Sequence, residues 1–274
     1  MENKKTMNLL VSLNSNFVNP VRVMLTSLIL NNTHCEITVY ALHSELDGED
    51  IKLLTDTAQR YGAAFIPYLV TGEHKEISKK SEFYPPEAFY RLFCTDYLPE
   101  EVSRVLYLDG DVIINGSLEN LYNLSMTEGE KRYIFAAATD PFNFSKDIFF
   151  HKLHLGLPLD VEYINSGVML MDLDYMREIS ASAEAAQQLI ASTQLFRFAD
   201  QDLINVLFHE KIMHIDSYMY NYSPVVNENR LFEFKYGSPV IIHFAGSVKP
   251  WEQSFPRHSI FGKVKELYEF YSVL

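Results

Sequence analysis

The first half of the chain alternates short apolar runs with amphipathic segments. The apolar runs at 8–13, 37–42 and 63–67 predict buried strands, because a strand covered on both faces reads as a continuous hydrophobic run. Between them, apolar residues recur at helical spacing, which predicts one helix that starts at Asn19-Pro20 and another over 51–61. This strand–helix order predicts a parallel sheet with helices on its faces.

The second half continues with strands and longer helices. Strands are predicted at 105–108, 134–139, 166–173 and 240–244, and helices from Pro85-Pro86 through 93, over 174–191 and over 201–208. The polar, charged segment 70–84 predicts a mobile surface loop. We find no internal repeat, low-complexity tract or linker that would divide the chain.

Composition and charge restrict the class of protein. With 274 residues, 47% of them hydrophobic, the chain is long enough to bury a sizeable core. A net charge of −13 opposes binding to nucleic acid and to anionic membranes. The N-terminal apolar stretch is too short for a signal peptide or a membrane span. Cys35 and Cys94 lie far apart and predict neither a disulfide framework nor a cysteine metal site, so we expect a cytoplasmic protein.

A carboxylate pair follows the fourth predicted strand. Asp109 and Asp111 flank Gly110, and the glycine allows a tight turn in which both carboxylates face one cation. Oxygen ligands of this kind suit Mg²⁺ or Mn²⁺. The simpler alternative is an ordinary turn, since Asp and Gly are common turn residues. The hydrophobic strand before the pair favours the metal site, because it places both side chains on rigid backbone.

A histidine ends the last predicted strand and begins the run HFAGSVKPW. This run places a nitrogen ligand, His243, within seven residues of Gly246 and of a cation, Lys249. Imidazole beside two carboxylates favours Mn²⁺. The chain lacks the Gly-rich and Walker phosphate loops, so Lys249 and the backbone N–H of Gly246 are candidate phosphate contacts. The alternatives are a structural histidine and a solvated surface lysine.

Taken together, these stretches resemble glycosyltransferase family eight, which includes glycogenin and the bacterial lipopolysaccharide α-galactosyltransferases and α-glucosyltransferases. The stretches LLVSLNSNF, EAFYRLFCTDYLP, RVLYLDGDVII, YINSGVMLMDL, ADQDLINV and HFAGSVKPW follow the family order from residue 9 to residue 251. The resemblance implies a single-domain GT-A nucleotide-diphospho-sugar transferase fold, with a Rossmann-like, mostly parallel α/β sheet. It divides residues 1–274 into a nucleotide-binding part over about 7–112, a sugar and acceptor part over about 113–252, and a helical C-terminal segment over about 253–274.

The resemblance also assigns roles to individual residues. The implied metal ligands are Asp109, Asp111 and His243. The implied donor contacts are Gly246 and Lys249 at the diphosphate, Arg91 elsewhere on the donor, and Asn14 and Phe17 at the base. Relatives often have an acidic residue at the position of Asn14, which departs from that pattern. The implied sugar-pocket residues are Asn165 and Asp140, together with Asp200 and Gln201 near the anomeric centre.

The expected activity is transfer of glucose or galactose from UDP-glucose or UDP-galactose to a glycan, of saccharide or lipopolysaccharide type, with retained configuration. Mn²⁺ is the expected cofactor and Mg²⁺ the alternative. Three alternative functions stay open. One is a nucleotidyltransferase, although we find no basic Gly-rich phosphate loop. The others are a catalytically silent sugar-nucleotide-binding module and self-glycosylation on one of the 17 tyrosines. We expect no integral membrane segment, and weak peripheral membrane contact stays open.

Overall fold

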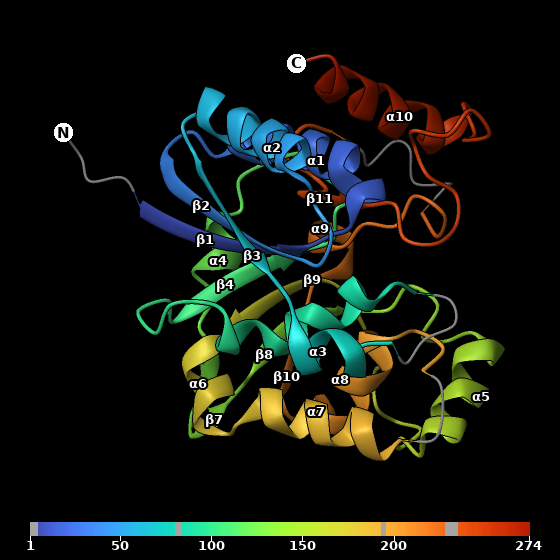
Figure 1. Cartoon of the computed structure of the whole chain (residues 1–274). Coiled ribbons are helices and arrows are strands. Elements are labelled where there is room, and N and C mark those ends of the chain that lie inside the picture. The colour runs from blue at the N-terminus through green and yellow to red at the C-terminus, as the bar shows by residue number, and fades with distance from the viewer. Residues whose placement is uncertain (1–4, 80–83, 193–195, 228–234) are drawn as a thin grey trace.

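A seven-stranded sheet forms the centre of the molecule (Figure 1). The computed structural model describes residues 5–79, 84–192, 196–227 and 235–274. The strand order is β10-β8-β9-β4-β1-β2-β3. In chain order these strands are β1 (Lys5–Ser12), β2 (Cys35–His43), β3 (Ala64–Leu69), β4 (Arg104–Leu108), β8 (Phe135–Thr139), β9 (Ile164–Asp172) and β10 (Ile212–Ile215). The predicted mostly parallel α/β sheet is confirmed.

One strand, β9, runs against its neighbours. It pairs antiparallel with both β4 and β8, whereas the other strand pairs of this sheet are parallel. Leu108 near the end of β4 therefore lies opposite Val168, and Thr139 at the end of β8 lies opposite Ile164. The first residues of β9 thus reach the same edge of the sheet at which β4 and β8 end.

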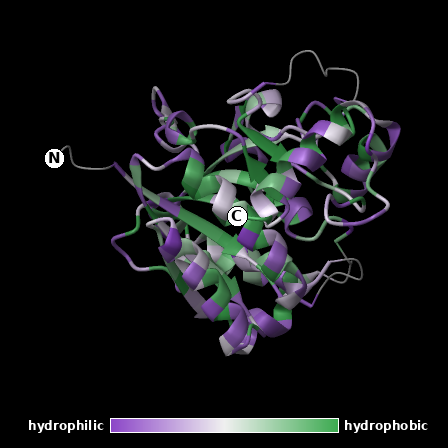
Figure 2. Ribbon diagram, turned by 90° about the horizontal axis from the view of Figure 1, so that it is seen from above, coloured by the Kyte–Doolittle hydropathy of each residue, from purple (hydrophilic) through white to green (hydrophobic). Residues whose placement is uncertain are grey.

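Helices cover both faces of the sheet (Figure 1). One face packs against α1 (Val18–Asn31) and α2 (Gly48–Arg60). The other packs against the 3-10 helix η2 (Pro86–Asp96) and against α6 (Leu173–Glu178), α7 (Ala181–Ala191) and α8 (Asp200–Phe208). Seen from above, the strands are mainly hydrophobic and much of the outer helical surface is hydrophilic (Figure 2). The layers follow from burying the apolar stripe of each helix on the sheet.

A second, two-stranded sheet lies beside the first. It pairs β5 (Val112–Ile114) antiparallel with β11 (Ile241–His243). Helix α10 (Ser259–Ser272) packs on β11 and on α1 and closes this part of the core. The remaining elements are η1 (Ser15–Phe17), α3 (Gly72–Ile77), α4 (Glu119–Tyr122), β6 (Thr127–Glu128), β7 (Lys131–Arg132), α5 (Lys146–Leu155), η3 (His209–Lys211) and α9 (Ser217–Tyr220).

Three details of the predicted elements were wrong. Segment 174–191 is not one helix: α6 ends at Glu178 and α7 starts at Ala181, because Ser180 has φ 55, in the left-handed region that interrupts a right-handed helix. Segment 70–84 is not wholly loop, since it contains α3, where the His74 ring stacks on Phe93 with centroids 4.4 Å apart. Residues 80–83 lie outside the described part. The helix after Pro85 is a 3-10 helix.

Two expectations from composition concern cysteines and membrane spans. Cys35 and Cys94 are buried and form no disulfide. None of the helices in the described part of the chain combines the length and the hydrophobicity needed to cross a bilayer.

Candidate functional site

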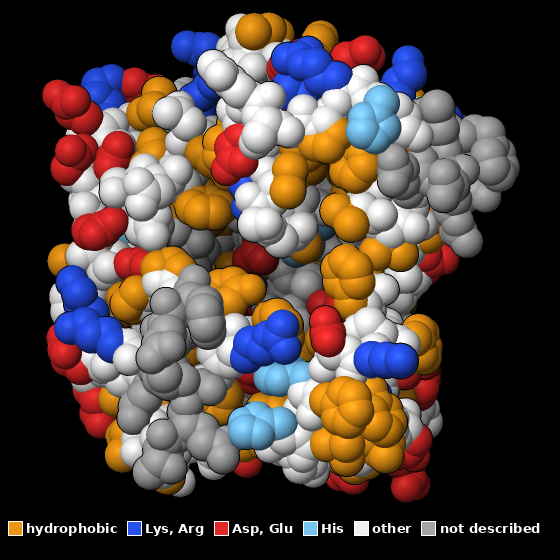
Figure 3. Space-filling view, turned by 90° about the vertical axis from the view of Figure 1, so that its right-hand side faces the viewer, with side chains coloured by type: hydrophobic (Ala, Val, Ile, Leu, Met, Phe, Trp, Pro, Cys, Tyr) orange, Lys and Arg blue, Asp and Glu red, His pale blue; other side chains and the backbone are white. Residues whose placement is uncertain are grey.

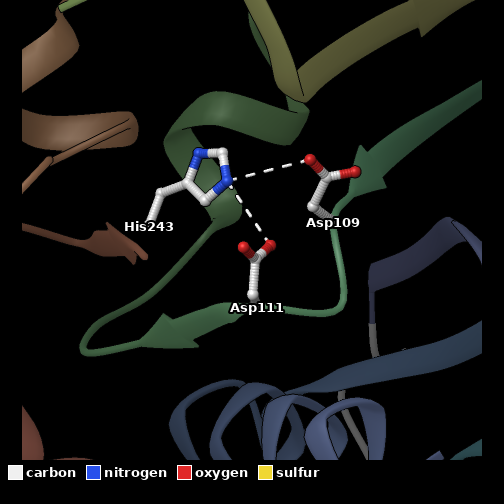
Figure 4. Close-up of side chains that lie close together, drawn as sticks. All are labelled: Asp109, Asp111 and His243. Carbon is white, nitrogen blue, oxygen red and sulfur yellow. Dashed lines mark ion pairs between the residues drawn. The ribbon is translucent and has the colours of Figure 1, made fainter. Parts of the chain in front are cut away.

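The turn after β4 brings two carboxylates to one histidine. Asp109 directly follows β4, and Asp111 directly precedes β5. Because β11 pairs antiparallel with β5, His243 lies opposite Val112 and thus beside Asp111. His243 Nε2 lies 3.7 Å from Asp109 Oδ2 and 3.4 Å from Asp111 Oδ1 (Figure 4). One ligand atom from each residue lies within 4.8 Å of the others, a spacing that one cation can bridge.

Hydrogen bonds leave one ligand atom of Asp109 facing the histidine. Asp109 Oδ1 accepts hydrogen bonds from the Tyr107 hydroxyl at 2.8 Å and from Arg91 Nη2 at 3.0 Å. The other oxygen, Oδ2, therefore faces His243. The sequence analysis did not identify this use of Arg91, which fixes a carboxylate; whether Arg91 also contacts the donor stays a prediction.

The protonation of His243 follows from its neighbour Asn221. Nδ1 of His243 lies 2.7 Å from Asn221 Oδ1, while the amide nitrogen of Asn221 donates to Asn165 Oδ1 at 2.9 Å. Since the amide oxygen of Asn221 can only accept, Nδ1 carries a proton, and in the neutral imidazole Nε2 then presents its lone pair to the two carboxylates. A neutral imidazole with a hydrogen-bonded second nitrogen is a common metal ligand, so these residues fit a divalent cation.

Two glycines make the close approach at this site sterically possible. A Cβ on Gly167 would lie 2.3 Å from His243 Cε1 and 2.7 Å from Asp109 Oδ2. A Cβ on Gly110 would lie 2.7 Å from Val21 Cγ2 of α1. The sequence had suggested that Gly110 is needed for backbone freedom in a tight turn. Gly110 is not among the glycines of positive φ, so the turn requires glycine for space against α1 instead.

A lysine completes the charge balance around Asp111. Lys249 Nζ forms an ion pair with Asp111 Oδ2 and donates to the Phe244 carbonyl at 2.8 Å. Burial acts to raise the pKa of Asp111, but the positive charges of His243, when it is protonated, and of Lys249 outweigh burial and hold that pKa well below its usual value. Gly246, between Phe244 and Lys249, has φ 97, a conformation that favours glycine. The diphosphate contacts predicted for Lys249 and Gly246 stay predictions, although the loop places Lys249 beside the candidate metal ligands.

Three residues predicted for the sugar pocket form a cluster with Asn221. Gln201 Oε1 accepts from Asn165 Nδ2 at 3.0 Å, and Gln201 Nε2 donates to Asp140 Oδ2 at 3.2 Å. With the two hydrogen bonds of Asn221, a continuous series runs from His243 to Asp140. In this series each amide accepts on one side and donates on the other. We call it the amide series: His243, Asn221, Asn165, Gln201 and Asp140.

Asp200 lies apart from the amide series, against Arg91. Its Oδ2 is 3.1 Å from Arg91 Nε but accepts no hydrogen bond from the described residues, since Nε donates to the Ala88 carbonyl. Burial raises the pKa of Asp200 to about 7, against the lowering influence of Arg91. Arg91 is itself buried over the Tyr107 ring and donates to the Ser166 carbonyl at 2.7 Å. The site therefore contains a buried carboxylate oxygen that faces Arg91 and accepts no hydrogen bond from the described residues.

The two residues predicted at the base lie at the end of β1. Asn14 accepts a hydrogen bond from the Asn16 N–H at 3.1 Å and caps η1. The Phe17 ring meets Trp251 edge-on, with ring centroids 5.9 Å apart, and packs close to Gly110. These contacts place Phe17 between the β4 turn and the loop after β11. No described contact identifies a base, so both roles stay predictions.

One residue of the Asp200-Gln201-Asp202 triplet at the start of α8 has a structural role. Asp202 is fully buried, accepts from Tyr163 and from the Phe198 N–H at 2.9 Å, and its Oδ1 lies 2.6 Å from His151 Nε2. It therefore fastens α5 to the start of α8, which carries Asp200 and Gln201. The stretch ADQDLINV was the sequence signal for Asp200 and Gln201, whereas Asn221 lay in none of the stretches that carried the resemblance.

A hollow of about 230 Å³ opens beside the amide series. Asp140 and Asn221 line it on one side, and Phe144 and Tyr218 add aromatic surface. We call it the inner hollow. Its volume lies below the roughly 300–1,000 Å³ usual for small-molecule sites, and it combines apolar walls with a few polar groups, as such sites do.

Comparison with known proteins agrees with this geometry. The chain matches the sequence model described as Glycosyl transferase family 8 over residues 8–254. It is 25% identical over 264 residues to a lipopolysaccharide 1,2-glucosyltransferase of Escherichia coli, covering 92% of this chain and 75% of the relative. It is 23% identical over 250 residues to the lipopolysaccharide 1,3-galactosyltransferase of Salmonella typhimurium, covering 89% and 72% of the two chains.

A solved structure of similar shape is that of the galactosyltransferase LgtC in complex with donor and acceptor sugar analogs. The TM-score is 0.78 at 18% identity, and the match covers 97% of this chain and 95% of that one. This likeness confirms the GT-A fold predicted from the sequence. Because the family match extends over nearly the whole chain and includes the carboxylate turn, the triplet of α8 and His243, the protein belongs to glycosyltransferase family 8.

Proposed function

We propose that the protein transfers a hexose, glucose or galactose, from a UDP-sugar to a hydroxyl group of a glycan, with retention of the anomeric configuration. The observation that carries this proposal is the convergence of Asp109, Asp111 and His243 beside Lys249 in a member of a glycosyltransferase family. The named relatives, a lipopolysaccharide glucosyltransferase and a galactosyltransferase, support the choice of sugar and a saccharide or lipopolysaccharide-type acceptor.

Asp109 Oδ2, Asp111 and His243 Nε2 are the residues that would hold a divalent cation, Mn²⁺ for preference and Mg²⁺ as the alternative. When bound, such a cation supplies positive charge that stabilises a diphosphate leaving group. Lys249 adds a second positive charge at the same place, which matters in a chain of net charge −13. Phe17 and Asn14 would then bind the base at the end of β1.

Gln201 and Asp200 would act on the transferred sugar. Both lone pairs of Gln201 Oε1 are engaged, by Asn165 Nδ2 and by the Ser166 N–H at 3.2 Å. This geometry makes Gln201 a poor covalent nucleophile and favours attack by the acceptor on the face from which the phosphate leaves, which preserves the configuration. The departing phosphate would accept the proton of the acceptor hydroxyl. Asp200 would accept a hydrogen bond from a sugar hydroxyl through Oδ2, which accepts none from the described residues.

The inner hollow is the proposed place of the acceptor unit that receives the sugar. It reaches Asp140 and Asn221, and so adjoins the residues assigned to the donor sugar. We further regard residues 1–274 as one catalytic domain and expect it in the cytoplasm, an expectation supported by two buried cysteines that form no disulfide.

A donor screen tests this proposal. The protein is incubated with Mn²⁺ and each of UDP-glucose, UDP-galactose and UDP-N-acetylglucosamine, and released UDP is measured. Asp109→Asn should reduce release by about 10²–10³-fold, as expected for loss of charge stabilisation at a leaving group. The matched control is Asp56→Asn, since Asp56 is exposed on α2 and forms an ion pair with Lys52 one helical turn away. Full activity in EDTA, or a β-linked product by NMR from the α-linked donor, contradicts the proposal.

A further inference from the structure

The surface around α5 has a concentration of exposed hydrophobic side chains. Large apolar residues that are 43–89% exposed follow one another between positions 142 and 159; they are Phe142, Phe144, Phe149, Phe150, Leu153 and Leu159. Figure 3 shows the face on the right-hand side of Figure 1, where α5 lies, and hydrophobic side chains gather on its lower half. Contiguous apolar surface of this kind marks a site of interaction in a soluble protein.

A second hollow, of about 300 Å³, opens within this surface. We call it the outer hollow. Phe144, Phe149 and Leu159 form its apolar walls, and Asp160 and Glu162 line it as well. It has Phe144 in common with the inner hollow. The two hollows therefore adjoin, and a chain-like ligand can extend from the inner hollow, beside Asp140 and Asn221, across Phe144 into the outer hollow.

The charges of the outer hollow disfavour an anionic ligand. Its lining residues include two acids, Asp160 and Glu162, and one cation, Lys152. Lys152 is buried, and its Nζ donates to the carbonyls of Leu159 at 3.0 Å and Val161 at 2.8 Å. An anionic phosphate or lipid headgroup would meet negative charge there. A sugar ring fits instead, because its C–H face packs on aromatic rings while its hydroxyls donate to carboxylates.

Two contacts fix the position of the outer hollow relative to Gln201 and to the inner hollow. His151 of α5 contacts Asp202 at 2.6 Å, and Asp202 directly follows Gln201 in α8. On its other side, Glu162 accepts a hydrogen bond at 2.6 Å from Thr139, which lines the inner hollow. A ligand that occupies both hollows therefore binds in one register.

We propose that the outer hollow binds a saccharide unit of the acceptor that lies beyond the unit receiving the transferred sugar. The acceptor is accordingly a neutral oligosaccharide, and its length contributes to recognition. The inference rests on the glycosyl transfer proposed above and specifies the substrate class of the same site.

Acceptor length and two phenylalanines provide the test. UDP release above the acceptor-free rate is measured with methyl glucoside, methyl galactoside, lactose, maltose and maltotriose. The better di- or trisaccharide should have a higher kcat/KM than either monosaccharide. Phe149→Ala should lower that kcat/KM roughly tenfold, as loss of one aromatic contact predicts, and should leave the values for the monosaccharides within about twofold. The matched control is Phe150→Ala: Phe150 is 65% exposed on the same helix but does not line the outer hollow.

Direct binding separates failure of this inference from failure of the proposed activity. Saturation-transfer NMR with maltotriose and lactose reports saccharide binding even if no donor is turned over, whereas acceptor-free UDP release reports donor chemistry alone. The inference is overturned if acceptor length has no effect on either measurement, or if Phe149→Ala and Phe150→Ala weaken saccharide binding equally. It is also overturned if both variants lose co-sedimentation with phosphatidylcholine vesicles while saccharide binding is unchanged, because α5 would then contact lipid.

Discussion

Asn221 links the candidate metal ligand to the predicted sugar pocket, and its removal has a calculable effect. Asn221→Ala deletes the acceptor of the His243 Nδ1–H, at 2.7 Å, and the donor to Asn165 Oδ1, at 2.9 Å. Asn221 is 5% exposed, so access of bulk water to either partner is restricted, although the side chain borders the inner hollow. An unsatisfied buried polar group costs about 1–3 kcal/mol. Loss of the hydrogen-bond acceptor of a metal-binding histidine typically weakens metal binding about 10–100-fold, or roughly 1.4–2.8 kcal/mol. This free energy agrees with the cost of the unsatisfied polar group.

The measurement is a Mn²⁺ titration in which electron paramagnetic resonance reports the free ion, so turnover is not required. Asn115→Ala is the matched control. Asn115 is equally buried, donates two hydrogen bonds, at 3.0 and 2.8 Å, and lies at the end of the β5–β11 pair away from His243. It should lower the melting temperature without changing the Kd for Mn²⁺. The reasoning fails if Asn221→Ala binds Mn²⁺ within twofold of the unmodified protein, or if Asn115→Ala weakens binding as much.

A second substitution separates the two ends of the amide series. Asn221→Asp keeps an oxygen that accepts from His243 Nδ1–H, a carboxylate–histidine arrangement common in metal sites. It cannot donate to Asn165 Oδ1. We therefore expect Asn221→Asp to retain Mn²⁺ affinity but to lower the transfer rate. Loss of Mn²⁺ binding in this variant would show that the amide series does not act through the histidine.

Three further predictions concern charge and burial. Lys249→Ala should weaken UDP as much as UDP-sugar, by about 1.5–3 kcal/mol, when both are titrated calorimetrically; an unchanged Kd for UDP contradicts the diphosphate contact. The pKa of Asp200 is raised to about 7 from an ordinary 3.8, so the native state binds the extra proton and stability falls as pH rises between these values. The asparagine side chain does not titrate, so Asp200→Asn does not lose this stability. The free energy of unfolding of the variant minus that of the unmodified protein, measured in urea, should therefore rise by roughly 2–3 kcal/mol between pH 5 and pH 8. A difference that does not change with pH contradicts the shift. Asp202→Ala leaves His151 without its buried partner and should cost roughly 2–5 kcal/mol of unfolding free energy, against less than about 0.5 kcal/mol for the exposed Asp174→Ala.

Local pattern was sufficient for most strands and for the carboxylate turn. A buried strand is recognisable from its own hydrophobic run, and residues that directly follow a parallel strand must lie at the ligand-binding edge of the sheet. For this reason Asp109 and Asp111 could be predicted at that edge. His243, in the antiparallel strand β11, was joined to them by the family resemblance, and the structure brings ligand atoms of the three residues within 4.8 Å of one another. The helix 174–191 failed because one serine takes a backbone conformation that no hydrophobic pattern records.

Only the tertiary structure decided how the rest of the site is assembled. The antiparallel direction of β9 brings Asn165 and Gly167 to the end of β4, and strand direction depends on the path of the connecting chain, not on the strand sequence. Gly110 and Gly167 are required by side chains distant in sequence, from α1 and from His243. Asn221 lies 56 residues from Asn165 and 22 from His243, and an isolated asparagine has no periodicity to identify it. The sequence alone thus determined which residues stand at strand ends, while packing between distant segments determined which of them touch.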